Sequence, residues 1–224
     1  IDRLAASGRA FHNHYVNAPT CGASRYSLLT GDYYQGAKNH ALFDRAKQLN
    51  QGGIIRPSLP AWFRQHGYTA ISIGKVSHHP GGLGGKDWDD PTMVEMPNSW
   101  DLSLQPLGDC QHPRGVMHAL AEGKIWGSGE ILSVFEAFDG DDQSYPDGLI
   151  AETSIKQIKK LGASGSPFFM AVGFIRPHLP FGAPKKYLDL YADCELPEIP
   201  HPNKPKHPSS WTNSGEFMRY NRWS

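Results

Sequence analysis

The sequence lacks the features that mark several large classes of protein. Its 224 residues carry 22 basic and 22 acidic side chains, so the formal net charge is zero. A chain without net charge or blocks of like charge lacks the electrostatic footprint of a general nucleic-acid binder. No apolar run reaches the roughly 18 to 20 residues that span a bilayer. We therefore expect a soluble globular chain with no nucleic-acid partner and no membrane span.

Cysteine is scarce, and its spacing excludes further classes. The three cysteines, Cys21, Cys110 and Cys194, lie far apart in the sequence. Disulfide frameworks and cysteine-based zinc sites need closely spaced pairs, which this chain does not have. Cys110 and Cys194 could pair in an oxidising compartment, but their spacing does not decide it. The odd count leaves at least one thiol to explain.

Both ends of the sequence have the character of the interior of a longer chain. It opens at Ile1 with a short helical pattern and has neither an initiator Met nor a signal-peptide pattern. Residues 196–224 contain five prolines and many polar residues without apolar periodicity. We expect this tail to be irregular and held by nothing local. The hypothesis is one partial domain over residues 1–224.

The hydrophobic pattern predicts helices that precede strands. Strands are expected at 9–16, 68–73 and 167–174, and helices at 25–30, 58–67 and about 147–161. The last helix has Ile150, Ile155, Ile158 and Leu161 on one stripe and Gly162 as its cap. The apolar run at 167–174 is typical of a parallel strand covered on both faces. The pattern predicts an α/β fold with a doubly wound, mostly parallel sheet between helix layers, incomplete at both ends.

Residues 83–146 differ in composition from the rest of the chain. They are rich in Trp, Gly and Asp and show weak periodicity. We interpret them as a loop-rich insertion that faces the substrate. If the substrate is a sugar, Trp88, Trp100 and Trp126 are candidates for stacking on it, and Trp100 and Trp126 are expected to set its selectivity.

Three loops next to the predicted elements carry the reactive side chains. Cys21 lies at the entrance of a helix, where free N–H groups and the helix dipole favour an anion, and Arg25 adds a cation. Lys75 and His78 follow the second strand together, and His178 follows the third strand between two prolines. Because ligands gather beyond the carboxyl ends of parallel strands, these loops predict an anion pocket with a nucleophile and acid/base groups.

Each loop also has a purely structural interpretation. Cys21 could be a small buried residue beside a structural arginine, and the Lys75 loop could be exposed without any role. His178 could simply pack under a turn. His78 and His79 are adjacent on extended chain and point to opposite sides, so they are poor candidates for one shared metal ion.

The three loops together resemble the sulfatase family of the alkaline phosphatase superfamily. Cys-Gly-Ala-Ser-Arg at 21–25, followed by Leu-Leu-Thr-Gly at 28–31, matches the family signature Cys-x-(Pro/Ala)-x-Arg. Gly-Lys-Val-Ser-His at 74–78 looks like the second block. Residues 167–181 are similar to the third block, particularly to its form in iduronate-2-sulfatase-like enzymes. The blocks occur in family order and cover most of the chain.

The resemblance implies a mechanism and a role for each loop. A maturation enzyme would convert Cys21 to formylglycine, whose hydrated aldehyde attacks sulfur and forms a covalent sulfate ester. Arg25 would hold the formylglycine and Lys75 would contact the sulfate. His78 would accept a proton during collapse of the ester, and His178 would bind the sulfate and help protonate the leaving group. Counting back from Pro80-Gly81 selects His79 instead of His78. We expect His78 to take this role and His79 to be a substrate-binding candidate.

The resemblance also implies a calcium ion and a compartment. Family members bind Ca²⁺ with formylglycine and Asp-containing pairs, of which only the Cys21 ligand has a counterpart here. Asp89-Asp90 and Asp141-Asp142 read as loop, and neither pair is assigned to the metal. The family is typically periplasmic, secreted or lysosomal. The implied function is hydrolysis of a sulfated carbohydrate, with a phosphodiester or phosphonate hydrolase and a noncatalytic carbohydrate-binding fragment as alternatives.

Overall fold

The computed structural model describes residues 1–33, 36, 38–125, 131–203, 206 and 215–221. The α-helices are α1 (Asp2–Ser7), α2 (Cys21–Thr30), α3 (Ala41–Asn50), α4 (Leu59–Gln65), α5 (Pro113–His118), α6 (Pro146–Ser164) and α7 (Lys185–Asp189). The strands are β1 (Thr69–Gly74), β2 (Leu83–Gly84), β3 (Asp90–Val94), β4 (Leu102–Leu104), β5 (Phe135–Phe138), β6 (Phe168–Gly173) and β7 (Phe181–Pro184). None of the described helices combines the length and the apolar character that crossing a membrane requires.

A three-stranded parallel sheet in the order β4, β1, β6 lies at the centre of the fold. Ile71 of β1 pairs with Leu102 of β4 on one side and with Met170 of β6 on the other. Because all three strands run in the same direction, the loops that follow β1 and β6 leave the same edge of the sheet. This edge is where the second and third reactive loops lie.

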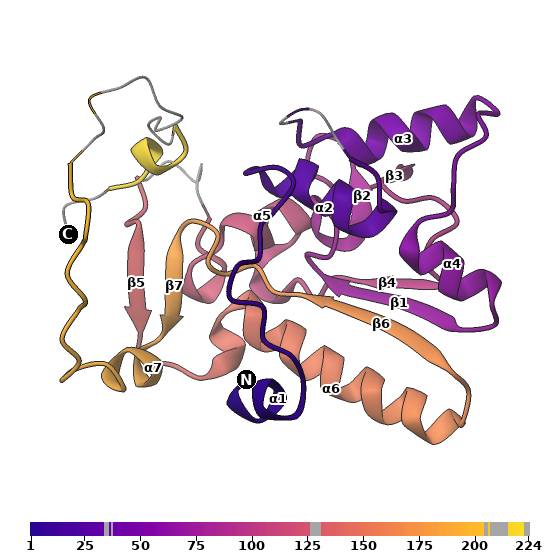
Figure 1. The fold of residues 1–224 in the computed structure, drawn as a ribbon. Coiled ribbons are helices and arrows are strands. Elements are labelled where there is room, and N and C mark those ends of the chain that lie inside the picture. The colour runs from indigo at the N-terminus through magenta and orange to yellow at the C-terminus, as the bar shows by residue number, and fades with distance from the viewer. Residues whose placement is uncertain (34–35, 37, 126–130, 204–205, 207–214, 222–224) are drawn as a thin grey trace.

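Helices cover both faces of this sheet (Figure 1). Ile71 and Ile73 of β1 share a core with Ile150 and Leu161 of α6. On the opposite face, Phe169 of β6 stacks on Phe63 of α4 at a centroid distance of 4.6 Å. Successive strand residues point to opposite faces, so the apolar run of β6 serves both layers. The predicted α/β architecture with a parallel sheet between helix layers is confirmed.

Local sequence signals explain where several elements begin and end. Ser58 caps α4, because its Oγ accepts a hydrogen bond from the Ala61 N–H at 3.3 Å. Helix α2 ends at Gly31, which adopts the left-handed conformation with φ of 70°. Helix α6 ends in the same way at Gly165, with φ of 68°. The cap predicted at Gly162 is therefore wrong, since Gly162 lies inside the helix.

Three further expectations are corrected by the structure. Residues 9–16 form no strand; Phe11 and Tyr15 are exposed, and no described strand supplies a hydrogen-bonding partner. On α6 the buried stripe runs through Ile150, Ser154 and Leu161, whereas Ile155 and Ile158 are about half exposed. Strand β6 is not fully covered, because it forms an edge of the described sheet and Val172 is 36% exposed.

Residues 83–146 are mostly loops and short helices, yet they also build part of the core. Strand β4 from this stretch pairs with β1 in the central sheet. Strand β5 pairs in parallel with β7, and β2 pairs antiparallel with β3. The tail was expected to be held by nothing local; residues 215–221 are held instead by contacts with distant parts of the chain. Tyr220 is only 4% exposed, and Asn221 forms a bridge with Ser133.

Candidate active site

The three reactive loops meet at a cavity of about 370 Å³. Cys21, His78 and His178, which the sequence placed on separate loops, all lie on its wall. The remaining lining residues come from α5, from the chain near α3 and β3, and from the tail: Asn39, Trp88, Arg114, Met117, His118, Gly215, Glu216, Arg219 and Tyr220. The structure thus brings a thiol, several imidazoles and cationic side chains around one opening.

Cys21 is the first residue of α2 and lines the cavity. Its Sγ lies 3.2 Å from Nδ1 of His78 and 3.7 Å from Oδ1 of Asn39. Asn39 also accepts a hydrogen bond from the Gly22 N–H at 3.0 Å. A Cβ on Gly22 would lie 2.3 Å from the Asn39 Cα, so only glycine allows this close approach. The position joins a reactive side chain to the positive end of a helix.

Arg25 ties helix α2 to the end of β1. Its Nη1 donates to the carbonyl oxygens of Lys75 at 2.5 Å and Val76 at 2.7 Å. Arg25 lies four positions after Cys21, so both side chains lie on the same side of α2. The guanidinium therefore brings a positive charge beside Cys21 and fixes the loop that carries Lys75.

Lys75 is a buried cation behind the cavity wall, with 2% of its surface exposed. Burial lowers the pKa of Lys75 to about 8; the nearby Arg25 charge also lowers it, whereas Cys21 and Glu216 raise it. Lys75 can take this place because two glycines meet beside it. A Cβ on Gly173 would lie 1.9 Å from the Lys75 carbonyl oxygen, and one on Gly74 would lie 2.3 Å from the Gly173 carbonyl oxygen.

His78 and His79 have different surroundings. His78 faces Cys21, and burial together with the nearby charges of His79 and Lys75 lowers its pKa to about 3. Its ring is therefore neutral at pH 7 and can accept a proton. His79 does not line the cavity; its ring packs edge-on against Phe43 at 4.8 Å and is 2% exposed.

Glu95 supports the two histidines and was missed by sequence reasoning. Its side chain is completely enclosed, and its carboxylate accepts hydrogen bonds from the His78 N–H at 3.3 Å and the His79 N–H at 3.0 Å. Oε1 also lies 3.3 Å from Nδ1 of His79, without hydrogen-bond geometry. Since Glu95 lies in a loop that follows β3, no local motif marks it.

His178 is held by the element that precedes its strand. Asp147, in the first turn of α6, accepts hydrogen bonds from the Ile175 N–H at 2.6 Å and the Arg176 N–H at 3.0 Å. Arg176 in turn donates to the His178 carbonyl oxygen at 3.1 Å. Burial, together with the charge of Lys75, lowers the pKa of His178 to about 4, so this ring is neutral at pH 7 as well.

Several residues of the site had no signal in the sequence. His118, at the end of α5, lies with its ring 5.4 Å from that of His178. Glu216 lies 3.7 Å from His178 Nε2, although it belongs to the tail. Both come from stretches without regular periodicity, where only the folded chain shows which side chains meet. The hydrophobic pattern could find neither.

The predicted tryptophans divide into two kinds. Trp88 lies on the cavity wall, and the Arg114 guanidinium lies 6.0 Å from its ring centroid. Trp100 instead packs on Phe169 of β6 at 6.0 Å, as part of the core, and does not line the cavity. The expected role of Trp100 in substrate selectivity is therefore wrong. Trp126 lies outside the described residues.

The other two cysteines are free thiols. Cys110 is buried and Cys194 is exposed, so the pairing that the sequence left open is not formed. Burial raises the pKa of Cys110 to about 11, which makes it unreactive. Of the three, only Cys21 combines access to the cavity with nearby cations.

The residues that the structure describes do not fit the calcium site that the resemblance implies. Among them, one group of three or more His, Cys, Asp or Glu side chains gathers closely enough to hold an ion, and it consists of His118, His178 and Glu216. Calcium prefers six to eight oxygen ligands, which this group does not offer. The donors around Cys21 therefore do not fit calcium, and no step is assigned to that ion.

Comparisons with known proteins identify the family of the chain. A family model described as Sulfatase matches residues 1–216. Human iduronate 2-sulfatase is 30% identical over 207 residues, which is 92% of this chain and 35% of that protein. An arylsulfatase of Clostridium perfringens is 25% identical over 215 residues, covering 88% of this chain and 42% of its own length. This chain thus spans well under half of the curated relatives that it matches.

The fold is also similar to a solved structure. The crystal structure of a phosphonate monoester hydrolase from Agrobacterium radiobacter matches with a TM-score of 0.55 and 21% sequence identity, covering 88% of this chain and 40% of that one. This likeness concerns the fold alone. Because the family model covers nearly the whole sequence, the chain belongs to the sulfatase family.

Proposed function

We propose that the chain carries the nucleophile and the sulfate-binding groups of a sulfuric ester hydrolase that acts on sulfated carbohydrates. The observation that carries this proposal is the position of Cys21, at the start of α2, on the cavity wall and 3.2 Å from His78 Nδ1. The Cys21 Sγ stands in for the oxygen of a formylglycine made from this residue. Once formed and hydrated, that group supplies a hydroxyl oxygen that bonds to sulfur while the ester oxygen leaves.

The residues around Cys21 stabilise charge, transfer protons and hold the site in place. Arg25 places a positive charge beside Cys21 and holds the Lys75 loop through two carbonyl oxygens. Lys75 offsets negative charge near Cys21, since Cys21 acts to raise the pKa of Lys75. The neutral His78 ring accepts a proton at Nδ1 from the group at position 21. His79 supports this ring from behind, outside the cavity.

His178 must gain a proton before it can donate to sulfate. Its Nδ1 lies 2.8 Å from the Leu179 carbonyl oxygen, which can only accept, so Nδ1 carries the hydrogen and Nε2 of the neutral ring is bare. A bound sulfate raises the pKa of a neighbouring imidazole. The substrate itself therefore promotes protonation of Nε2, which can then donate to sulfate and protonate the leaving oxygen.

The substrate class rests on the relatives and on two residues of the cavity. The matched relatives include iduronate 2-sulfatases from human and mouse. Trp88 on the cavity wall offers a face on which a sugar ring can stack, and Arg114 next to it can meet an acidic group. The compartment proposed with this function is periplasmic, secreted or lysosomal.

Mass spectrometry of the tryptic peptide that contains Cys21, from protein made in its native host, tests the proposal. Formylglycine replaces the thiol by an aldehyde oxygen, which changes the mass of this peptide alone. Cys194 serves as the internal control, since it is exposed and should keep its thiol. An unmodified Cys21 contradicts the formylglycine mechanism and supports a noncatalytic carbohydrate-binding role.

A phosphodiester or phosphonate hydrolase is the second candidate. The fold match to a phosphonate monoester hydrolase favours it, and cationic groups bind phosphonate as well as sulfate. Turnover of an aryl sulfate and of an aryl phosphonate monoester with the same leaving group separates the two functions. We expect the larger kcat/KM for the sulfate; the reverse order would assign the chain to the second function.

A further inference from the structure

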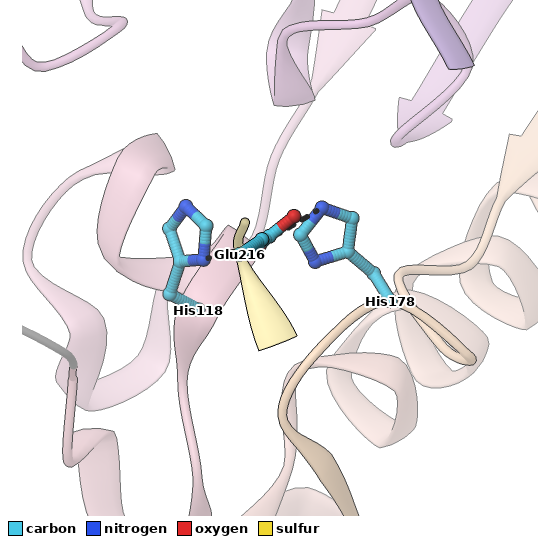
Figure 2. Close-up of side chains that lie close together, drawn as sticks. All are labelled: His118, His178 and Glu216. Atoms are coloured by element: carbon cyan, nitrogen blue, oxygen red, sulfur yellow. Dashed lines mark ion pairs between the residues drawn. The ribbon is translucent and has the colours of Figure 1, made fainter. Parts of the chain in front are cut away.

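Three side chains on the cavity wall have the composition of a transition-metal site. His118 ends helix α5, His178 lies in the loop after β6, and Glu216 lies in the segment 215–221. Figure 2 shows the Glu216 carboxylate between the two imidazole rings. Glu216 Oε1 lies 3.7 Å from His118 Nδ1 and 3.7 Å from His178 Nε2. The three ligand atoms all lie within 4.8 Å of one another.

One oxygen of the Glu216 carboxylate lacks a hydrogen-bond donor. Its Oε1 is buried and accepts no hydrogen bond, although the rest of the side chain is partly exposed. A buried acceptor without a donor destabilises the fold, and a charged acceptor does so more strongly. A cation between the two rings would satisfy this oxygen, which a neutral imidazole with a bare nitrogen cannot do.

His178 already has the second hydrogen bond that is typical of metal-binding histidines. Its Nδ1–H donates to the Leu179 carbonyl oxygen at 2.8 Å, which leaves the lone pair of Nε2 facing Glu216. Histidine ligands of metals usually donate their other ring N–H to a carbonyl or carboxylate in this way. On the other side, His118 Nδ1 has a long contact of 3.4 Å with the Tyr220 hydroxyl, which an ion would replace.

The donor set selects the kind of ion. Two imidazole nitrogens and one carboxylate oxygen suit Zn²⁺ and related first-row ions, whereas Ca²⁺ and Mg²⁺ prefer oxygen alone. Bonds of about 2.0–2.1 Å in a tetrahedron place two ligands roughly 3.4 Å apart. The 3.7 Å contacts therefore need to close by only a few tenths of an ångström. We propose that His118, His178 and Glu216 bind one Zn²⁺ ion, with the fourth position open to the cavity.

Zinc in this site would compete with the proposed substrate. Zn²⁺ binds the bare Nε2 of His178, whereas a sulfate needs the same nitrogen protonated. This consequence, unlike the metal site itself, rests on the proposed function. Zn²⁺ is therefore expected to inhibit hydrolysis, and added chelator is expected to restore it.

Calorimetric titration of the 224-residue chain with ZnCl₂ tests the site without any substrate. A Cys194→Ser background removes the exposed thiol. We expect one ion per chain, with affinity reduced at least tenfold by His118→Ala and by Glu216→Gln. His201→Ala and Glu198→Gln change exposed residues of the same types and should leave the affinity unchanged. Circular dichroism confirms that each variant is folded.

The spectrum of the Co²⁺-substituted protein identifies the ligands. Nitrogen and oxygen ligands give a tetrahedral d–d spectrum without a thiolate charge-transfer band. A strong charge-transfer band would assign the ion to Cys21 and overturn the proposal, as would unchanged Zn²⁺ affinity in both folded variants or no binding by the parent chain. Because none of these readouts uses turnover, failure of the sulfatase proposal would not affect them.

Discussion

Lys75 combines a positive charge with almost complete burial and a cationic neighbour, Arg25, and this combination affects the stability of the folded protein. Burial lowers its pKa to about 8, below the ordinary value of 10.5, so protonated Lys75 destabilises the fold. The penalty is fully present below pH 8 and disappears as the pH rises from about 8 to 10.5. A group that is unfavourable for folding is retained here beside the proposed nucleophile.

Replacing Lys75 with Met should therefore stabilise the protein while removing activity. The difference between the two pKa values corresponds to roughly 3 kcal/mol at pH 7, and the gain should vanish near pH 10.5. Urea denaturation at both pH values measures it, and Lys160→Met, at an exposed position of α6, is the control. Lower stability of Lys75→Met at pH 7, or undiminished aryl sulfate turnover, would contradict this assignment.

The same residue predicts a pH dependence for anion binding. Inorganic sulfate should bind more weakly as the pH rises through about 8, because Lys75 loses its proton there. Lys75→Arg keeps the charge, so its affinity should decline only at a higher pH. Calorimetry with sodium sulfate between pH 6 and 10 measures both proteins. Identical pH profiles would show that another group controls the affinity.

Individual residues differ in how far the sequence predicts them. Cys21, His78 and His178 were predicted because each lies in a loop beside a helix or strand with a clear pattern. Glu95 and Glu216 were not, because their partners lie far away along the chain and no local pattern records a long-range contact. The choice between His78 and His79 likewise depends on which ring faces Cys21, and this depends on the position of α2 in the fold.

At the scale of elements, the ends of the paired strands β1 and β6 lie so close together that a Cβ on either terminal glycine would clash with backbone. Gly74 ends β1 and Gly173 ends β6, and their backbones meet beside Lys75. The loops that follow β1 and β6, which carry Lys75, His78 and His178, therefore start from one close backbone contact. The sequence shows a glycine at the end of each predicted strand, but only the register of β1 with β6 shows that the two are paired.

Gly173→Ala should disturb the site through this close contact between the strand ends. The added Cβ would lie 1.9 Å from the Lys75 carbonyl oxygen, so the loop must move. We expect a loss of about 2 to 3 kcal/mol in the free energy of unfolding and weaker sulfate binding. Gly162→Ala is the matched control: it lies inside α6 with open space around it and should stabilise the helix by up to about 1 kcal/mol. Normal sulfate affinity in Gly173→Ala would show that this close contact does not position the site.

The role of Trp100 depends on the element next to it. Composition suggested a sugar-stacking side chain, but β4 joins the central sheet and draws Trp100 onto Phe169. Trp100→Ala should therefore reduce stability by about 3 kcal/mol and affect all substrates equally. Trp62→Ala, at a 53% exposed position, is the control. A selective loss of turnover on sulfated sugars, with stability unchanged, would restore the original interpretation.

At the scale of the whole molecule, the central sheet was easier to predict than the segments near the two ends of the chain. The order of helices before strands, and the apolar run that became β6, were sufficient to predict a parallel α/β sheet. The strand expected at 9–16 failed because alternation alone does not supply a hydrogen-bonding neighbour. The contact of residues 215–221 with the site was also hidden, because a proline-rich segment carries no signal for where it docks.

The chain has no net charge, but its cavity differs from this average. The composition of the cavity leads to a prediction about metal selectivity. Among the described residues, the cavity wall presents mainly imidazole nitrogen and cationic side chains, and Glu216 is its one carboxylate. Calcium needs several carboxylate or carbonyl oxygens. We therefore expect the 224-residue chain to bind Ca²⁺ poorly, at least a hundredfold more weakly than Zn²⁺. Calorimetry with CaCl₂ and ZnCl₂ on the same preparation measures this ratio, and tight, stoichiometric Ca²⁺ binding would show that the chain assembles an oxygen-rich site.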